Sequence, residues 1–169
     1  MKIYSPVVTG SGAIVVHLNL ADRIPDYTLQ GIDPRWSVFT HLLKKYSRDC
    51  DVVHTAPDMG GAVLSGANKV VLTFHNYYLD KAYLSSVDVL RRAFYRTALH
   101  ASVSAAVKKA DCLVAVSHAT AALVKNDFDV DCYVIENGVD TGVFKPSSDT
   151  QANDKTRILF SGNPSTRKG

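Results

Sequence analysis

The chain has 169 residues and a mass of 18.4 kDa, which suits one domain of ordinary size and a fragment of a second. Apolar residues make up 46% and charged residues 21% of the sequence, so its composition excludes a wholly disordered chain. The formal net charge of +3 is too small to indicate a nucleic-acid-binding protein. No apolar run approaches about 18 residues, so we expect no transmembrane helix.

The N-terminus and the cysteines favour the cytoplasm. A single basic residue, Lys2, and a proline, Pro6, flank a short apolar run, which is typical of a first strand rather than a signal peptide. Cys50, Cys112 and Cys132 are odd in number and widely spaced. This spacing suits a reducing compartment rather than a disulfide framework. We therefore expect a cytoplasmic protein.

Short β-like runs alternate with helical stretches along the chain. In chain order, the apolar pattern predicts strands at residues 2–8, 27–32, 51–55, 69–75, 112–116 and 132–136. It predicts helices at residues 13–24, 34–48 and 118–125, one long helix or two joined helices at residues 83–109, and a further short helix after a turn at residues 59–61. Strands that alternate with helices form a mostly parallel sheet with helices on both faces. The sequence therefore predicts an α/β domain of the Rossmann-like class.

The composition changes near the end of the sequence. Residues 147–156 are polar and typical of a linker. A new strand is expected at residues 157–161, and a basic loop that contains glycine follows it. We therefore expect residues 1–146 to form one domain, and residues 157–169 to be the first strand and loop of a second.

Candidate site residues follow the predicted strands, because ligands of open α/β sheets bind beyond the carboxyl ends of the strands. The loop Gly10-Ser11-Gly12 lacks two β-carbons and precedes a helix, so a phosphate or a sugar can approach its backbone. His75 ends a strongly apolar strand, where an imidazole can hydrogen-bond a substrate hydroxyl or transfer a proton. His54 has a weaker signal of the same kind. A tight turn and buried core histidines are the plain structural alternatives.

Other motifs favour a structural interpretation. Ser117 precedes a helix, and we interpret its hydroxyl as an N-cap rather than a nucleophile. The Asp-x-Asp stretches at residues 49–51 and 127–131 precede strands and are typical of solvated turns. The histidines and cysteines show no zinc spacing, so we expect no metal and no bound cofactor.

A basic helical stretch adds a possible partner. Residues 83–109 contain one acid, Asp88, and combine an apolar face with several basic residues, namely Arg91, Arg92, Arg96, Lys108 and Lys109. Basic amphipathic helices can lie on anionic membranes, although most are ordinary surface helices. Peripheral contact with the inner face of the membrane is therefore an additional expectation.

Read in order, the strand motifs resemble the N-terminal domain of family 4 glycosyltransferases, which have the GT-B fold. The resemblance covers almost the whole chain and rests on residues 51–55, 71–76, 110–117, 134–140 with Phe144 and Pro146, and 158–162 with Lys168 and Gly169. The most specific of these pieces is Asn137-Gly138-Val139-Asp140, which is followed by Phe144-Lys145-Pro146.

The resemblance implies a retaining transfer of a sugar from a nucleotide-sugar to a glycan, a lipid-linked acceptor or a small-molecule acceptor. The N-terminal domain would mainly hold the acceptor, and a C-terminal domain would hold the nucleotide. His75 matches the histidine that contacts the donor sugar and assists catalysis. Gly10 and Gly12 match the glycine-rich loop near the donor diphosphate. Lys168 matches the lysine that binds this diphosphate, where an ammonium can neutralise charge on the leaving group.

The remaining residues assigned to donor or acceptor binding are Ser11, Asn76, Ser117 and Asn137. The chain also departs from the family pattern. Asn163 stands where many relatives have an arginine, and Arg167 is a candidate to replace that charge. The acidic pair of the family would lie beyond residue 169, so we expect this chain to be inactive by itself.

Two alternatives stay open at the level of the sequence. One is a stand-alone module that binds a glycan or a nucleotide without catalysis. The other is a small NAD-binding Rossmann protein. Asp33 lies about 20 residues after the glycine loop, where a ribose-binding acid is expected, but Val15 occupies the place of the third glycine of that fingerprint.

Overall fold

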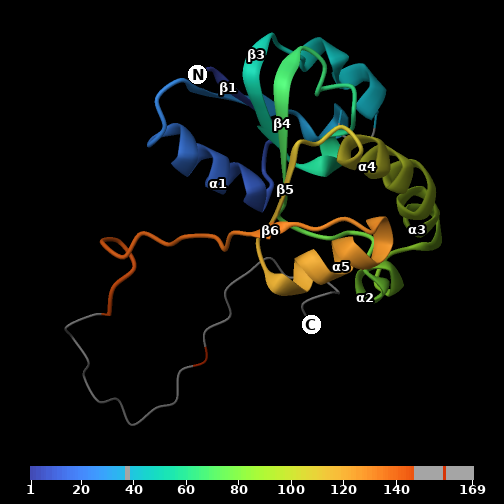
Figure 1. The fold of residues 1–169 in the computed structure, drawn as a ribbon. Helices are drawn as coiled ribbons and strands as arrows, with labels where there is room; N and C mark the ends of the chain where they lie inside the picture. Colours follow the sequence, from blue (N-terminus) through green and yellow to red (C-terminus); the bar gives the residue numbers. More distant parts are fainter. Residues whose placement is uncertain (37–38, 147–157, 159–169) are drawn as a thin grey trace. The chain divides into compact units, whose positions relative to one another are not determined.

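A computed structural model describes residues 1–36, 39–146 and 158 of the chain (Figure 1). The chain divides into two compact units, Met1–Glu136 and Asn137–Gly169, which we describe separately. Apart from Ile158, the predicted linker and the strand after it lie outside the described residues, as do Asn163, Arg167 and Lys168. The domain boundary at residue 146 stays a prediction.

The first unit is built on a six-stranded sheet in which every pairing is parallel. Its strands are β1 (Ile3–Val8), β2 (Tyr27–Ile32), β3 (Cys50–Thr55), β4 (Ala67–Phe74), β5 (Cys112–Ala115) and β6 (Tyr133–Val134). They lie in the order β2-β1-β3-β4-β5-β6. This arrangement confirms the prediction of an α/β Rossmann-like fold, and it is consistent with a GT-B domain.

Helices cover both faces of the sheet. α1 (Gly12–Ala21) packs on β1 and β2, and α5 (His118–Phe128) packs on β5 and β6. α2 (Lys81–Ser85), α3 (Val89–Phe94) and α4 (His100–Val107) connect β4 to β5. Figure 1 shows α1 on one side of the strands and α3 and α4 on the other. The strand order reverses direction after β2, so right-handed crossovers place α1 on the opposite face from the later helices.

The core lies between the central strands and the helix layer that contains α4. Leu72 and Phe74 on β4 are at most 1% exposed, and Val103 and Ala106 on α4 belong to the same cluster. Near-continuous burial along the second half of β4 is what a central parallel strand requires. None of the helices among the described residues is both long and apolar enough to span a bilayer.

The predicted helix at residues 34–48 is wrong. The chain instead forms two short 3-10 helices, η1 (Pro34–Trp36) and η2 (Thr40–Tyr46). Leu43 is fully buried there, whereas Trp36, Phe39 and Leu42 are 38–51% exposed. The apolar side chains that predicted a helix therefore do not pack together against the core. Two short 3-10 helices connect β2 to β3 instead.

Residues 83–109, predicted as one long helix or two joined ones, form several shorter helices. Asp88 accepts a hydrogen bond from the backbone N–H of Arg91 and so starts α3 as a new helix. The Arg92 guanidinium donates to the carbonyls of Leu84 and Val87, where the preceding helix has ended. A π-helical stretch, η4 (Tyr95–Leu99), then joins α3 to α4.

The short helix expected after residues 59–61 is also wrong. A 3-10 helix, η3 (Pro57–Met59), precedes this turn, and turns fill residues 60–66. Gly60 has φ of +71° and ends η3, because this left-handed backbone is costly for residues other than glycine.

Candidate functional site

The candidate site lies at the carboxyl ends of β1, β3 and β4. The connection after β1 leads to β2 on one side, and the connection after β3 leads to β4 on the other. Such a topological switch point leaves a crevice between the two strand ends, in which ligands of open α/β sheets bind. A pocket opens here, between the loop after β1, η3 after β3 and the residues that follow β4.

The pocket is largely apolar, with a few polar groups on its wall. Its volume is about 60 Å³, which is room for a few water molecules or one small group of a ligand. Val7, Met59 and Phe74 supply buried apolar wall. Its polar members are Ser11, Asp58, His75, Asn76 and the tyrosines Tyr77 and Tyr78. An apolar pocket with a few convergent polar groups is typical of a small-molecule site.

The glycine loop presents open backbone at one rim of the pocket. Gly10 has φ of +75°, and a β-carbon added at Gly10 or Gly12 would meet no atom within 4 Å. The Ser11 hydroxyl donates to the carbonyl of Val8 at 2.8 Å, and no side chain caps the N-terminus of α1. The positive end of the α1 dipole therefore faces the space above the loop, where it favours an anionic group.

Three histidines meet beneath the loop in a hydrogen-bonded network. His17 of α1 is fully buried, and its Nε2 lies 3.2 Å from Nε2 of His75. Its Nδ1 lies 2.7 Å from the Ser5 hydroxyl and 2.8 Å from the Tyr27 hydroxyl. These contacts link α1, β1, β2 and the end of β4 through side chains alone.

The network extends to the neighbouring strands through His54 on β3. Nδ1 of His54 lies 2.9 Å from the Tyr27 hydroxyl, and its Nε2 lies 2.8 Å from the Thr73 hydroxyl on β4. The rings of His17 and His54 are 4.6 Å apart between centroids. The sheet thus holds a row of imidazoles and hydroxyls across its carboxyl edge.

Burial keeps these imidazoles uncharged at neutral pH. Burial, and to a smaller extent the neighbouring histidines, lower the pKa of His17 to about 3 and that of His54 to about 4. Burial also lowers the pKa of His75. A neutral imidazole has one donor and one acceptor nitrogen. The nitrogen that donates in one ring therefore determines which nitrogen accepts in the ring that it contacts.

Two buried polar atoms of the pocket have no partner among the described residues. They are Nδ1 of His75 and Oδ1 of Asp58. Burial raises the pKa of the Asp58 carboxyl, although the residue as a whole is partly exposed. A buried polar atom without a partner costs about 1–3 kcal/mol, and such atoms are expected where a ligand supplies the missing partner.

The structure brings Ser11, His75 and Asn76 of the predicted site into one pocket, with Gly10 and Gly12 beside it. Asn76 is exposed, and its side-chain N–H group contacts the Tyr78 hydroxyl at 3.4 Å. Their roles in binding stay predictions.

Ser117 and Asn137 lie elsewhere in the described chain. Ser117 accepts a hydrogen bond from the backbone N–H of Thr120 at 3.1 Å, which confirms the N-cap interpretation of its hydroxyl. Asn137 belongs to the second unit. A binding role for either residue stays a prediction.

Sequence reasoning missed His17 and Asp58. His17 stands in the apolar stretch Ile14-Val15-Val16-His17-Leu18, where a polar residue facing a core is a usable signal. Asp58 follows Ala56 and Pro57 after a strand, and its position beyond a carboxyl end was the signal available. Neither residue lies in a spacing motif, because the contacts that define their roles come from distant parts of the chain.

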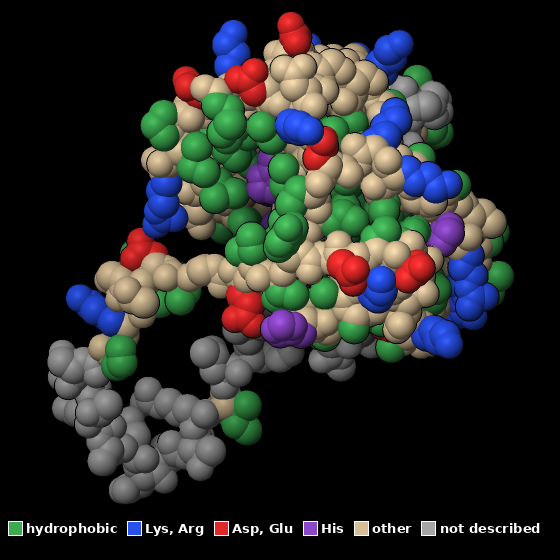
Figure 2. All heavy atoms as spheres, in the orientation of Figure 1, with side chains coloured by type: hydrophobic (Ala, Val, Ile, Leu, Met, Phe, Trp, Pro, Cys, Tyr) green, Lys and Arg blue, Asp and Glu red, His purple; other side chains and the backbone are tan. Residues whose placement is uncertain are grey.

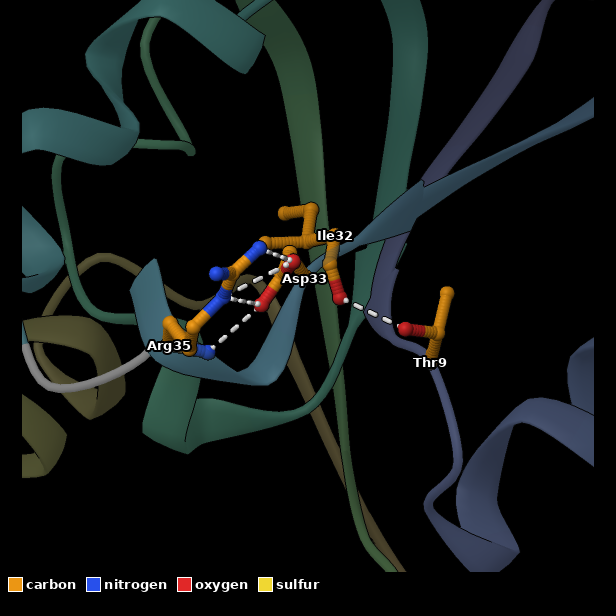
Figure 3. A network of polar contacts seen from close by, with 4 residues as sticks. All are labelled: Thr9, Ile32, Asp33 and Arg35. Carbon is orange, nitrogen blue, oxygen red and sulfur yellow. Dashed lines mark hydrogen bonds and ion pairs between the residues drawn. The ribbon is translucent and has the colours of Figure 1, made fainter.

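Asp33, the candidate ribose-binding acid, is engaged by a neighbour. Figure 3 shows the Arg35 guanidinium against both carboxylate oxygens of Asp33, with the shortest contact at 2.7 Å. The hydrogen bonds from Arg35 lower the pKa of Asp33 to about 2. Beside it, the Thr9 hydroxyl donates to the carbonyl of Ile32 and ties the end of β1 to β2. The Asp33 carboxylate is thus already paired, which does not favour the NAD-binding alternative.

The acids of the stretch at residues 127–131 also have partners. The Tyr77 hydroxyl donates to Asp127, and Lys125 forms ion pairs with Asp129 and Asp131 at 3.2 and 3.4 Å. No group of three or more histidines, cysteines and acids in the described part of the chain is arranged to hold a metal ion.

Comparison with known proteins identifies the family. The family model described as Glycosyltransferase Family 4 matches residues 10–143. No curated protein matches the chain. The match covers most of the sequence, including the glycine loop, the three histidines and most of the residues that line the pocket, so the chain belongs to glycosyltransferase family 4.

Proposed function

We propose that this member of glycosyltransferase family 4 supplies the acceptor-side domain of an enzyme that transfers a sugar from a nucleotide-sugar, with retention of configuration. The acceptor is a glycan, a lipid-linked molecule or a small molecule. The observation that carries the proposal is the pocket at the switch point, where Nδ1 of His75 is buried and without a partner. A sugar hydroxyl is the size and chemistry of group that this position can receive.

In the proposed reaction, the bond between the anomeric carbon and the diphosphate oxygen breaks, and a bond to an acceptor oxygen forms. The proton of the acceptor hydroxyl leaves with the departing diphosphate. His75 would orient the donor sugar through a hydrogen bond, since its lowered pKa keeps it neutral. The open amides at the start of α1 would favour the diphosphate charge. The apolar wall would exclude water, which otherwise competes as the acceptor.

The proposal assigns the nucleotide to a second domain. Lys168, which lies outside the described residues, would bind the donor diphosphate, and no metal ion is required. Residues 1–169 are therefore expected to be inactive alone, and the proposed place of action is the cytoplasm.

The first experiment is to read the source gene beyond the codon for Gly169 and to assay the protein that the complete reading frame encodes. Transfer of labelled sugar from a panel of nucleotide-sugars is expected. A His75→Ala variant should lower kcat by about 100-fold or more, in the range of a lost proton-transfer or orienting group. His118→Ala is a matched control, because His118 is an exposed histidine on α5 and outside the pocket.

Each outcome of this experiment is informative. A His75→Ala enzyme with undiminished turnover would remove the proposed role of His75. A reading frame that ends at Gly169, together with saturable binding of a glycan or nucleotide and no transfer, would favour the stand-alone binding module.

We also propose that the segment α2–α3 contacts the surface of an anionic membrane. Val89 and Leu90, at the start of α3, are 76% and 83% exposed. Arg91 and Arg92 follow them directly, and Arg96 lies four residues after Arg92. Figure 2 shows blue Lys and Arg side chains gathered along the edge of the molecule where α2 and α3 lie. Exposed apolar side chains beside cations are typical of peripheral membrane contacts.

Vesicle sedimentation tests this contact. The chain is expected to bind vesicles that contain phosphatidylglycerol more tightly than vesicles of phosphatidylcholine alone. Leu90→Glu should reduce this binding several-fold, whereas Leu18→Glu on α1, which is 47% exposed, should leave it unchanged. Equal binding to both kinds of vesicle would remove the proposal.

A further inference from the structure

The ring orientation of His75 depends on a neighbour that the proposed chemistry does not use. Of the two ring nitrogens of His75, Nε2 faces Nε2 of His17 at 3.2 Å, and Nδ1 is buried without a partner among the described residues. His75 itself is one of the residues that line the pocket. Both rings are neutral, so one proton lies between the two Nε2 atoms. The ring that carries this proton therefore decides whether His75 offers the pocket a donor or an acceptor.

Contacts at the other side of His17 indicate the direction. Nδ1 of His17 meets the hydroxyls of Ser5 and Tyr27 at 2.7 and 2.8 Å. These distances are shorter than the 2.9–3.0 Å typical of N–H donors and match those of hydroxyl donors. The distances favour Nδ1 of His17 as the acceptor of the Tyr27 proton, which would place the ring proton of His17 on Nε2.

The rest of the network is compatible with this direction. With the Tyr27 proton on His17, Nδ1–H of His54 can donate to the Tyr27 hydroxyl oxygen at 2.9 Å. The Thr73 hydroxyl then donates to Nε2 of His54 at 2.8 Å. Every proton in this chain of contacts has an acceptor, as buried polar networks require.

We propose that His17 is a positioning residue for His75, whose Nε2 accepts a hydrogen bond from Nε2–H of His17, so that Nδ1–H of His75 is directed into the pocket. His75 therefore presents a neutral donor, and the pocket receives an oxygen acceptor such as a sugar hydroxyl. That His75 meets the substrate rests on the proposed function, whereas its tautomer does not.

Nitrogen NMR of the chain with ¹⁵N-labelled histidine tests the tautomer directly at pH 7, without ligand. His75 is expected to carry its proton on Nδ1, and His17 on Nε2. Single substitutions of the histidines assign the signals. A His75 ring with its proton on Nε2, or an equal mixture of both tautomers, would overturn the proposal, and this result requires no variant of His17.

Two substitutions of His17 separate positioning from packing. His17→Phe keeps a ring in the core but removes the donor, and should convert His75 to a mixture of tautomers. His17→Gln keeps a side-chain N–H donor and should restore the Nδ1–H form. Thr73→Val is the control within the network, since it removes the contact of His54 and should leave His75 unchanged. A folded His17→Phe protein with an unaltered His75 tautomer would contradict the proposal.

The test is independent of catalysis. If the tautomers are as proposed but the complete enzyme transfers no sugar, the proposed function fails and the positioning role of His17 stands. If transfer depends on His75 while its proton lies on Nε2, the proposed function stands and this inference fails.

Discussion

The polar groups at the two edges of the same sheet differ in burial, charge and pairing. At the amino edge, near the starts of β4 and β5, Lys69 donates to Asp111 at 2.7 Å, and the backbone N–H of Val70 donates to the other carboxylate oxygen at 2.8 Å. Nearby, Asp51 accepts from the backbone N–H of Lys2 at 2.7 Å. These groups are charged, exposed and paired.

At the carboxyl edge, between the ends of β1, β3 and β4, three histidines are largely buried and uncharged, and two polar atoms lack partners among the described residues. His17 and Thr55 are fully buried there, and the two atoms without partners are Nδ1 of His75 and Oδ1 of Asp58. The amino edge satisfies its groups with surface contacts that cost little to form. At the carboxyl edge, buried polar atoms without partners destabilise the fold, and such atoms are expected where a ligand supplies the missing hydrogen bonds.

The largest expected effect is the loss of the His17 ring. His17→Ala would leave a cavity in a fully buried position and would remove the partner of Ser5, Tyr27 and His75. We expect the free energy of unfolding to fall by about 3–5 kcal/mol, as for other buried rings. Urea unfolding followed by circular dichroism measures this change. A loss below about 1 kcal/mol would show that the network contributes little to the fold.

Acid should weaken the carboxyl edge before it affects the amino edge. The folded pKa values of His17 and His54, about 3 and about 4, lie below the ordinary value of 6.5, so the unfolded chain binds more protons between these limits. Stability is therefore present above pH 6.5 and is lost as the pH falls. The two residues together should reduce the free energy of unfolding by about 3 kcal/mol between pH 7.5 and pH 5.5.

Urea unfolding over this pH range tests the prediction. His54→Gln should remove about half of the pH dependence, and His118→Gln, at an exposed position, should remove none. A stability that does not change between pH 7.5 and 5.5 would mean that these histidines are protonated as readily in the folded chain as in the unfolded one.

Asp58 allows the cost of the unpaired pocket group to be measured. Its folded pKa is raised by burial, so its charged form destabilises the folded chain, and this penalty grows as the pH rises through the folded pKa. Asp58→Asn should therefore raise the free energy of unfolding at pH 7 by about 1 kcal/mol, an advantage that shrinks in acid. Thermal unfolding at pH 7 and pH 5 measures both the gain in stability at neutral pH and its decrease in acid. A variant that is less stable at pH 7 would show that the charged carboxyl has a stabilising partner.

The main features of this fold were predictable because they depend on local patterns. The apolar runs of β4 and β5 predicted buried parallel strands, and β2 was predicted with its observed bounds. The predicted helix at residues 34–48 was wrong, and residues 83–109, predicted as one long helix or two joined ones, are divided further. A helical period alone does not show whether a matching core surface exists. Phe39 and Leu90, for example, belong to these apolar patterns but are exposed in the structure.

The site was predictable in part for a related reason. His75 and the glycine loop could be predicted from the sequence because they lie directly beyond the ends of predicted strands. The network behind His75 was not, since its partner His17 and the contacts of His17, Ser5 and Tyr27, are contributed by different elements and meet only after the sheet has formed. Nothing in their spacing along the chain encodes that meeting.

The smallest expected effect is at the amino edge. Lys69 is 67% exposed and Asp111 38% exposed, so water and salt screen their ion pair. Lys69→Met should change the unfolding transition only slightly at low salt, and the difference should vanish in 1 M sodium chloride. Urea midpoints of wild type and variant at both salt concentrations provide the measurement. A loss comparable with that of His17→Ala would break the contrast between the edges, because the exposed pair would then be as essential to the fold as the buried imidazoles. A slight, salt-sensitive loss would sharpen it, since the two edges would then differ in stability as they do in structure.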